Sequence, residues 1–61
     1  MKIFDGYLGN RPIEIILEED NHLYILDKLS NELTLYNKEY YFEDSDFSSV
    51  KIALLNEGFR I

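Results

Sequence analysis

Turn signals that recur along the chain constrain its fold more than any other feature. They separate short runs rich in Ile, Leu, Phe and Tyr, and they stand at Gly9-Asn10, Asp20-Asn21, residues 28–32 and Asn37-Lys38. Short runs between turns at this spacing are typical of an antiparallel meander. The first signal is the clearest, because glycine readily takes the positive φ that a two-residue hairpin turn requires.

Five short strands follow from these turns. We expect them at Lys2–Leu8, residues 11–19, Leu23–Asp27, residues 33–36 and residues 39–43. Within the first strand, Asp5 and Gly6 could form a bulge or a competing turn. Leucines at helical spacing would also allow a helix over residues 21–36. Ser30 and Asn31 at its centre favour a hairpin loop instead, with Asn31 in the left-handed region.

The period of the apolar residues changes in the last third of the chain. Phe47, Val50 and Leu54 recur at helical spacing and predict a helix that packs on the sheet through this stripe. Ser45 or Asp46 would cap its start, among acids that the helix dipole favours. Other apolar residues of this segment lie outside the stripe. The helix is therefore expected to carry apolar residues on a second face as well as on the face that packs on the sheet.

A further strand signal follows the helix. Gly58 is placed to end the helix as its C′ residue, and residues 59–61 are expected to form a short terminal strand. The predicted fold class is α+β and β-rich: an antiparallel meander of about five short strands with one C-terminal helix and a short terminal strand. Residues 1–61 fit a single small domain, in which one helix covers one face of the sheet and leaves the other largely open.

The turns also predict which side chains share a face, because a slip of one residue exchanges the two faces of a strand. A two-residue second turn would pair Leu17 with Tyr24 and Ile16 with Ile25. The core face would then carry Ile13, Ile15, Leu17, Tyr24 and Leu26, with Leu33, Leu35, Tyr40 and Phe42 from the next hairpin. The opposite face would carry Glu14, Ile16, Glu18, Leu23, Ile25 and Asp27, with Thr34, Tyr36, Glu39 and Tyr41.

Charge and residue types exclude several kinds of site. Twelve acids against six Lys and Arg give a net charge of −6, whereas binding to nucleic acid depends on clustered cations. The chain has no cysteine, so disulfides and thiolate metal sites are excluded. His22 follows Glu18, Glu19 and Asp20, but these residues straddle a tight turn that points them in different directions. We therefore expect no metal, no cofactor and no direct contact with nucleic acid.

Catalytic patterns are equally weak. Ser45, Ser48 and Ser49 have no feature that would bring His22 to them as a base, and the glycines are isolated and precede no helix, unlike a phosphate-binding loop. We expect no enzymatic activity. No secretory signal and no apolar run long enough for a bilayer are visible, so we expect a cytoplasmic protein without membrane contact.

Outward apolar and aromatic residues framed by acids are the most informative remaining feature. Such a surface is typical of self-association or partner binding, and Tyr suits interfaces because its large rigid ring is ordered at modest entropic cost. The candidate partner-binding residues are Glu14, Ile16, Glu18, Leu23, Ile25, Asp27, Tyr36, Glu39 and Tyr41.

Three classes of function fit this surface. The first is a non-enzymatic inhibitor that binds a basic, nucleic-acid-handling surface of a larger host protein, using acids as phosphate mimics and the apolar–Tyr patch for affinity. In size, in acidity and in its many residue types with AT-rich codons, the chain resembles, as a class, small inhibitors of phages and mobile elements, such as anti-CRISPR and other anti-defence proteins. No motif links it to one family within that class.

The other two classes use the same surface differently. One is a homo-oligomeric binder or sponge for a small nucleotide, in which Arg11, Arg60 or Lys51 would converge on phosphates across subunits. The other is a structural or assembly accessory protein. For so short a chain, a homo-oligomer such as a dimer is expected in all three classes, because association buries apolar surface that one domain leaves open.

Overall fold

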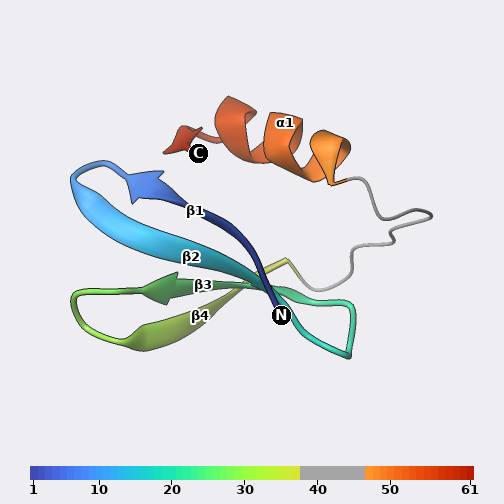
Figure 1. Cartoon of the computed structure of the whole chain (residues 1–61), viewed down its shortest axis with the longest axis horizontal. Helices are drawn as coiled ribbons and strands as arrows, with labels where there is room; N and C mark the ends of the chain where they lie inside the picture. Colours follow the sequence, from blue (N-terminus) through green and yellow to red (C-terminus); the bar gives the residue numbers. More distant parts are fainter. Residues whose placement is uncertain (38–46) are drawn as a thin grey trace.

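A computed structural model describes residues 1–37 and 47–61 and confirms the predicted fold class (Figure 1). Five antiparallel strands form one sheet in the order β4-β3-β2-β1-β5. Their bounds are β1 Lys2–Leu8, β2 Arg11–Leu17, β3 Leu23–Asp27, β4 Glu32–Asn37 and β5 Phe59–Arg60, with helix α1 at Ser48–Asn56. The turn expected at Lys38 and the strand expected over residues 39–43 lie outside the described residues.

The first hairpin has the predicted two-residue turn. Leu8 pairs with Arg11, and between them Gly9 has a φ of 62°. Of the two turn residues only Gly9 has a positive φ, which is the type II′ arrangement whose twist matches that of the flanking strands. The glycine therefore sets the register of β1 on β2.

The second hairpin differs from the prediction by one residue. Its loop contains three residues rather than two, because Asn21 takes a left-handed conformation with a φ of 61°. The N–H of Asn21 donates to the carbonyl of Glu18 (3.0 Å), and the N–H of Glu18 donates to the carbonyl of His22 (3.2 Å). A turn followed by a left-handed residue is a common three-residue hairpin loop. Leu17 consequently pairs with Leu23 and not with the next residue.

This shift exchanges the two faces of β3, so the predicted facing of that strand was wrong. Leu23 is only 1% exposed and Ile25 packs against the core, although both were expected to point outward. Asp27 shares their side of the strand. Tyr24 and Leu26, which were expected in the core, lie on the opposite face.

The third turn confirms the hairpin and excludes the alternative helix over residues 21–36. Asn31 has a φ of 59°, as predicted, and its N–H donates to the carbonyl of Asp27 (2.7 Å). The carboxylate of Asp27 accepts from the backbone N–H groups of Leu29 (2.9 Å) and Ser30 (3.3 Å). Asp27 therefore stabilises this loop. We had expected it to frame an outward patch, and that prediction was wrong.

Strand β4 also faces the other way from the prediction. Leu33 and Leu35 were expected in the core, but they pair with the two outward residues of β3 and are 48% and 44% exposed. The pairing then shifts by one residue, and Tyr36 falls at this irregularity. Its ring meets Phe59 edge-on with centroids 5.6 Å apart, so Tyr36 packs against the core rather than pointing outward.

Helix α1 begins slightly later than predicted and ends as predicted. Its N-cap residue is Phe47, which makes no side-chain capping hydrogen bond, whereas Ser45 and Asp46, the expected caps, lie outside the described residues. Gly58 has a φ of 99°, and its N–H donates to a carbonyl of the last helical turn (3.1 Å). Over the described ranges, no helix combines the length and apolar character needed to cross a membrane.

Strand β5 pairs with the edge of β1 that faces away from β2. Gly6 makes this pairing possible, because a Cβ atom at Gly6 would clash with the carbonyl oxygen of Arg60. Neither the bulge nor the competing turn considered at Asp5 and Gly6 forms. The pairing of β1 with β2 is instead irregular between Lys2 and Phe4.

The core lies between α1 and one face of the sheet. It consists of Ile13, Ile15, Leu23, Val50, Leu54 and Phe59. Val50 and Leu54 belong to the predicted helical stripe, with Phe47 packed at its margin. On the far side of α1, Ile52 and Leu55 are 59% and 46% exposed, so the helix does carry apolar residues on a second face.

Candidate protein-binding face

We call the side of the sheet that points away from α1 the outer face. Its residues alternate with core residues along each strand. Strands β2, β3 and β4 contribute Glu14, Ile16, Tyr24, Leu26, Leu33 and Leu35. Within the described part of the chain, no element covers this face, because the single described helix packs on the other one (Figure 1).

Five of these side chains form what we call the apolar strip: Ile16, Tyr24, Leu26, Leu33 and Leu35. Ile16, Tyr24 and Leu35 lie opposite one another across three strands, and Leu26 lies opposite Leu33 in the next row. Side chains opposite each other across strands pack together. The strip is thus a continuous surface, and it is most open at the β4 side, where both leucines are about half exposed.

The structure brings only part of the predicted partner-binding set to this face. On it or at its end are Glu14, Ile16 and Glu18. On the core side are Leu23, Ile25, Asp27 and Tyr36. Outside the described residues are Glu39 and Tyr41.

Sequence reasoning missed four members of the strip because it placed them in the core. The facing of Tyr24 and Leu26 depends on the length of the second turn, and Leu33 and Leu35 share it because they pair with these two residues. The signal was present in Asn21, since asparagine is enriched in the left-handed region. The same argument correctly placed Asn31, and applying it to both asparagines would have predicted the observed facing of β3.

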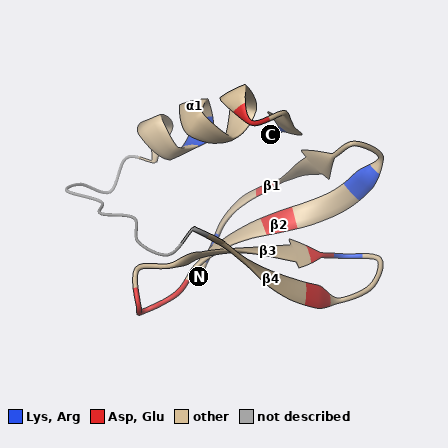
Figure 2. Ribbon diagram, turned by 180° about the vertical axis from the view of Figure 1, so that it is seen from behind, with Lys and Arg blue, Asp and Glu red and all other residues tan. Residues whose placement is uncertain are grey.

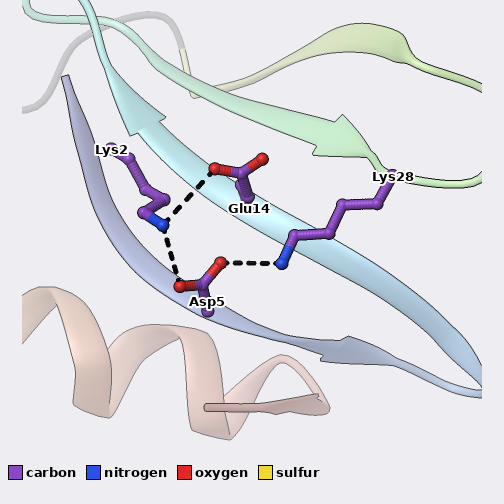
Figure 3. A network of polar contacts seen from close by, with 4 residues as sticks. All are labelled: Lys2, Asp5, Glu14 and Lys28. Carbon is purple, nitrogen blue, oxygen red and sulfur yellow. Dashed lines mark hydrogen bonds and ion pairs between the residues drawn. The ribbon is translucent and has the colours of Figure 1, made fainter.

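A charged network occupies the β1 side of the outer face (Figure 3). The Nζ atom of Lys2 lies 3.0 Å from Asp5 Oδ2 and 3.8 Å from Glu14 Oε1, and the Nζ atom of Lys28 lies 2.8 Å from Asp5 Oδ1. Hydrogen bonds from Lys28 and Lys2 lower the pKa of Asp5, and the hydrogen bond to Asp5 raises the pKa of Lys2. The acids on this side are therefore largely compensated within the chain.

The acids in the loop between β2 and β3 are compensated much less. We call Glu18, Glu19 and Asp20 the acidic loop. Over the described residues, none of the three forms an ion pair with Lys or Arg, and the one ion pair of Asp20 is with His22 (Nδ1 to Oδ2, 3.0 Å). In Figure 2 this loop is a red segment at one end of the sheet, and the opposite end carries both basic and acidic segments.

Asp20 also orders the neighbouring strand. Its Oδ1 atom accepts the backbone N–H of His22 (2.9 Å), and its Oδ2 atom accepts the hydroxyl of Tyr24 (3.1 Å). The His22 N–H is the main reason that the pKa of Asp20 is lowered. The hydrogen bond to Asp20 in turn raises the pKa of Tyr24. The ring of Tyr24 is thereby held at the end of the apolar strip that adjoins the acidic loop.

The basic residues at the other end of the sheet have separate partners. Arg11 pairs with Asp27, which raises the pKa of Arg11 and lowers that of Asp27. Arg60 donates to the carbonyl of Gly9 (2.9 Å) and lies over the ring of Tyr7, 5.2 Å from its centroid. Within one chain, these two arginines do not converge on a shared phosphate-sized site.

The described residues include His, Asp and Glu, three side-chain types that can ligate a metal ion. No three of their His, Asp and Glu side chains are grouped so that they could hold a metal ion. His22 forms an ion pair with Asp20 at the end of β3 opposite Lys28. Comparisons with protein-family models, curated proteins and solved structures found no match.

Proposed function

We propose that this chain is a non-enzymatic interaction protein that binds a basic surface of a larger protein through its outer face. The observation that carries the proposal is the apolar strip, which no described element covers and which ends at the acidic loop. The exposed leucines of β4 and the partly buried Tyr24 provide affinity when a partner covers them, and the acids select a partner of opposite charge.

The charge of the chain supports a basic partner. The net charge is −6, and the acids that the described structure leaves without Lys or Arg partners include the two glutamates of the acidic loop. Carboxylates in such a position can stand in for nucleic-acid phosphates on a protein that handles nucleic acid. This chemistry suits an inhibitor encoded by a phage or mobile element, acting in the cytoplasm against a host defence such as CRISPR.

The proposal is tested by affinity capture from a bacterial lysate with the tagged full-length chain at two salt concentrations, read beside the oligomeric mass of the chain alone. We expect one or a few host proteins of high pI at low salt and their loss at moderate salt, because exposed charges are screened within about 10 Å at 0.1 M ionic strength. Absence of any captured protein, or capture that moderate salt does not weaken, would contradict the proposal.

A further inference from the structure

The outer face contains a hollow where its apolar and acidic parts meet. We call it the acidic hollow, with a volume of about 490 Å³ and a lining of Glu18, Glu19, Asp20, Tyr24 and Leu33. It is shallow and open to solvent. Its apolar floor is the end of the strip, and its polar wall is the acidic loop, so one ligand could contact both at the same time.

The floor of the hollow is already ordered without a ligand. The hydroxyl of Tyr24 donates to Asp20 Oδ2, and Asp20 is held in turn by the N–H of His22. Asn21 fixes the backbone of the loop in its left-handed turn. A surface whose side chains are held in place loses less conformational entropy on binding than a mobile one.

The charges around the hollow indicate the chemistry of its occupant. Elsewhere on the sheet Asp5, Glu14 and Asp27 each contact Lys or Arg of the same chain. Over the described residues Glu18 and Glu19 contact none, so their charges are available to a second molecule. Exposed Leu33, at 48%, supplies apolar area next to them.

We propose that the acidic hollow receives a basic segment of the partner protein in which one aliphatic side chain is flanked by Lys or Arg. The aliphatic side chain packs on Tyr24 and Leu33, and the flanking cations pair with Glu18 and Glu19. This inference rests on the proposed function and specifies the partner's recognition element. A second copy of this chain fits less well, because it would bring the same uncompensated acids and another net charge of −6.

The test is an NMR titration of the isotope-labelled full chain with a capped Lys-Lys-Leu-Lys-Lys peptide. Two control peptides differ only in their central or flanking residues: Lys-Lys-Ser-Lys-Lys and Glu-Glu-Leu-Glu-Glu. We expect saturable shifts of the amides of the acidic loop, Tyr24 and Leu33 with the first peptide. Binding should be several-fold weaker with the serine peptide and absent with the acidic one.

Protein variants separate the apolar contribution from the charged one. Leu33→Ser should weaken binding of the leucine peptide about tenfold, since burying a leucine side chain stabilises a complex by about 1.5 kcal/mol or more. Glu19→Gln should weaken it roughly two- to fivefold, as expected for an exposed ion pair. Leu55→Ser, at an exposed leucine on α1, is the matched control and should bind like the parent chain.

Several results would overturn the inference. These are no saturable shift with the leucine peptide, shifts centred on α1 or β5, or equal binding of the leucine and serine peptides. Another such result, without peptide, is that NMR signals of the apolar strip broaden as the protein concentration rises while the measured molecular mass doubles. That result would show that a second copy occupies the face. Salt-sensitive capture of a host protein, combined with peptide shifts outside the hollow, would support the proposed function and contradict this site. Peptide binding in the hollow, without capture of any protein, would support the site and contradict the proposed function.

Discussion

Two asparagines in the left-handed region determine how this sheet presents its side chains. Asn21 and Asn31 have φ values of 61° and 59° and lie at the ends of the second and third loops. Because Asn21 adds a residue to its loop, Leu23 turns to the core and Tyr24 turns outward. A single backbone conformation therefore assigns residues to the core or to the candidate binding face.

The cost of the left-handed conformation gives the first prediction. Asn21→Ala should lower the free energy of unfolding by about 1 kcal/mol, because an ordinary L-residue is disfavoured there by that order. Asn21→Gly should retain the parent stability or exceed it, since glycine takes a positive φ freely. Urea unfolding of both variants measures this. An equal loss in the glycine variant would show that the conformation of Asn21 is not what stabilises the loop.

Asp27 gives a prediction for the dependence of stability on pH. Its hydrogen bond with Arg11 lowers its pKa below the ordinary value of 3.8, so the folded state favours the carboxylate. The stability that it contributes is present above 3.8 and is lost as the pH falls through the lowered folded-state pKa. Asp27→Asn should therefore flatten the acid limb of the unfolding free energy between about pH 5 and pH 2.

A double substitution checks whether Arg11 is the cause. Arg11→Met should flatten the same limb, and adding it to Asp27→Asn should cause little further change, because the two residues interact with each other. Full additivity of the two effects would mean that the pair does not act as a unit.

At the scale of elements, the sequence predicted what depends on neighbouring residues. Local conformation is specified by Gly9, by the stripe of Val50 and Leu54, and by Gly58. The predictions of the first hairpin, of helix α1 and of the end of α1 were therefore correct. The facing of β3 and β4 depends on loop length, for which Asn21 was the overlooked signal, and on the irregular pairing at Tyr36, which the periodicity of apolar residues does not encode. Of the candidate site, the residues on β2 were therefore placed correctly and those on β3 and β4 were not.

The packing of α1 on the sheet leads to a prediction with an internal control. Leu54 is 1% exposed and Leu55 is 46% exposed on the same helix. Leu54→Ala should cost about 2–5 kcal/mol through lost burial and the cavity left behind. Leu55→Ala should change stability by less than about 0.5 kcal/mol. Urea unfolding followed by circular dichroism measures both, and similar losses would contradict the assigned face of α1.

The pairing of β5 with β1 depends on Gly6. Gly6→Ala should destabilise the fold by about 1–3 kcal/mol, because the new methyl group overlaps the carbonyl of Arg60. Amide exchange should also become faster at Arg60 and at Tyr7, its pairing partner. Gly9→Ala is the matched control, since it strains a positive φ without any contact. Unchanged exchange at Arg60 in the Gly6 variant would show that β5 does not depend on this glycine.

At the scale of the whole molecule, the two faces of the sheet have different roles. One face and α1 enclose the core, and the outer face combines an apolar strip with an acidic loop. Lys2, Lys28 and Arg11 pair with acids elsewhere on the sheet, whereas the acidic loop at one end has no Lys or Arg partner among the described residues (Figure 2). The small size of the chain explains this division, because one short helix covers only one face.

Capture from a bacterial lysate with two double variants tests most directly whether the outer face binds the partner. Leu33→Ser with Leu35→Ser alters the apolar strip, and Ile52→Ser with Leu55→Ser makes the same chemical change on exposed residues of α1. Circular dichroism first checks that both chains are folded. We predict that the strip variant loses the salt-sensitive host protein by about tenfold or more, while the helix variant captures it like the parent chain. Retention by the strip variant with loss in the helix variant would contradict the assignment of the outer face.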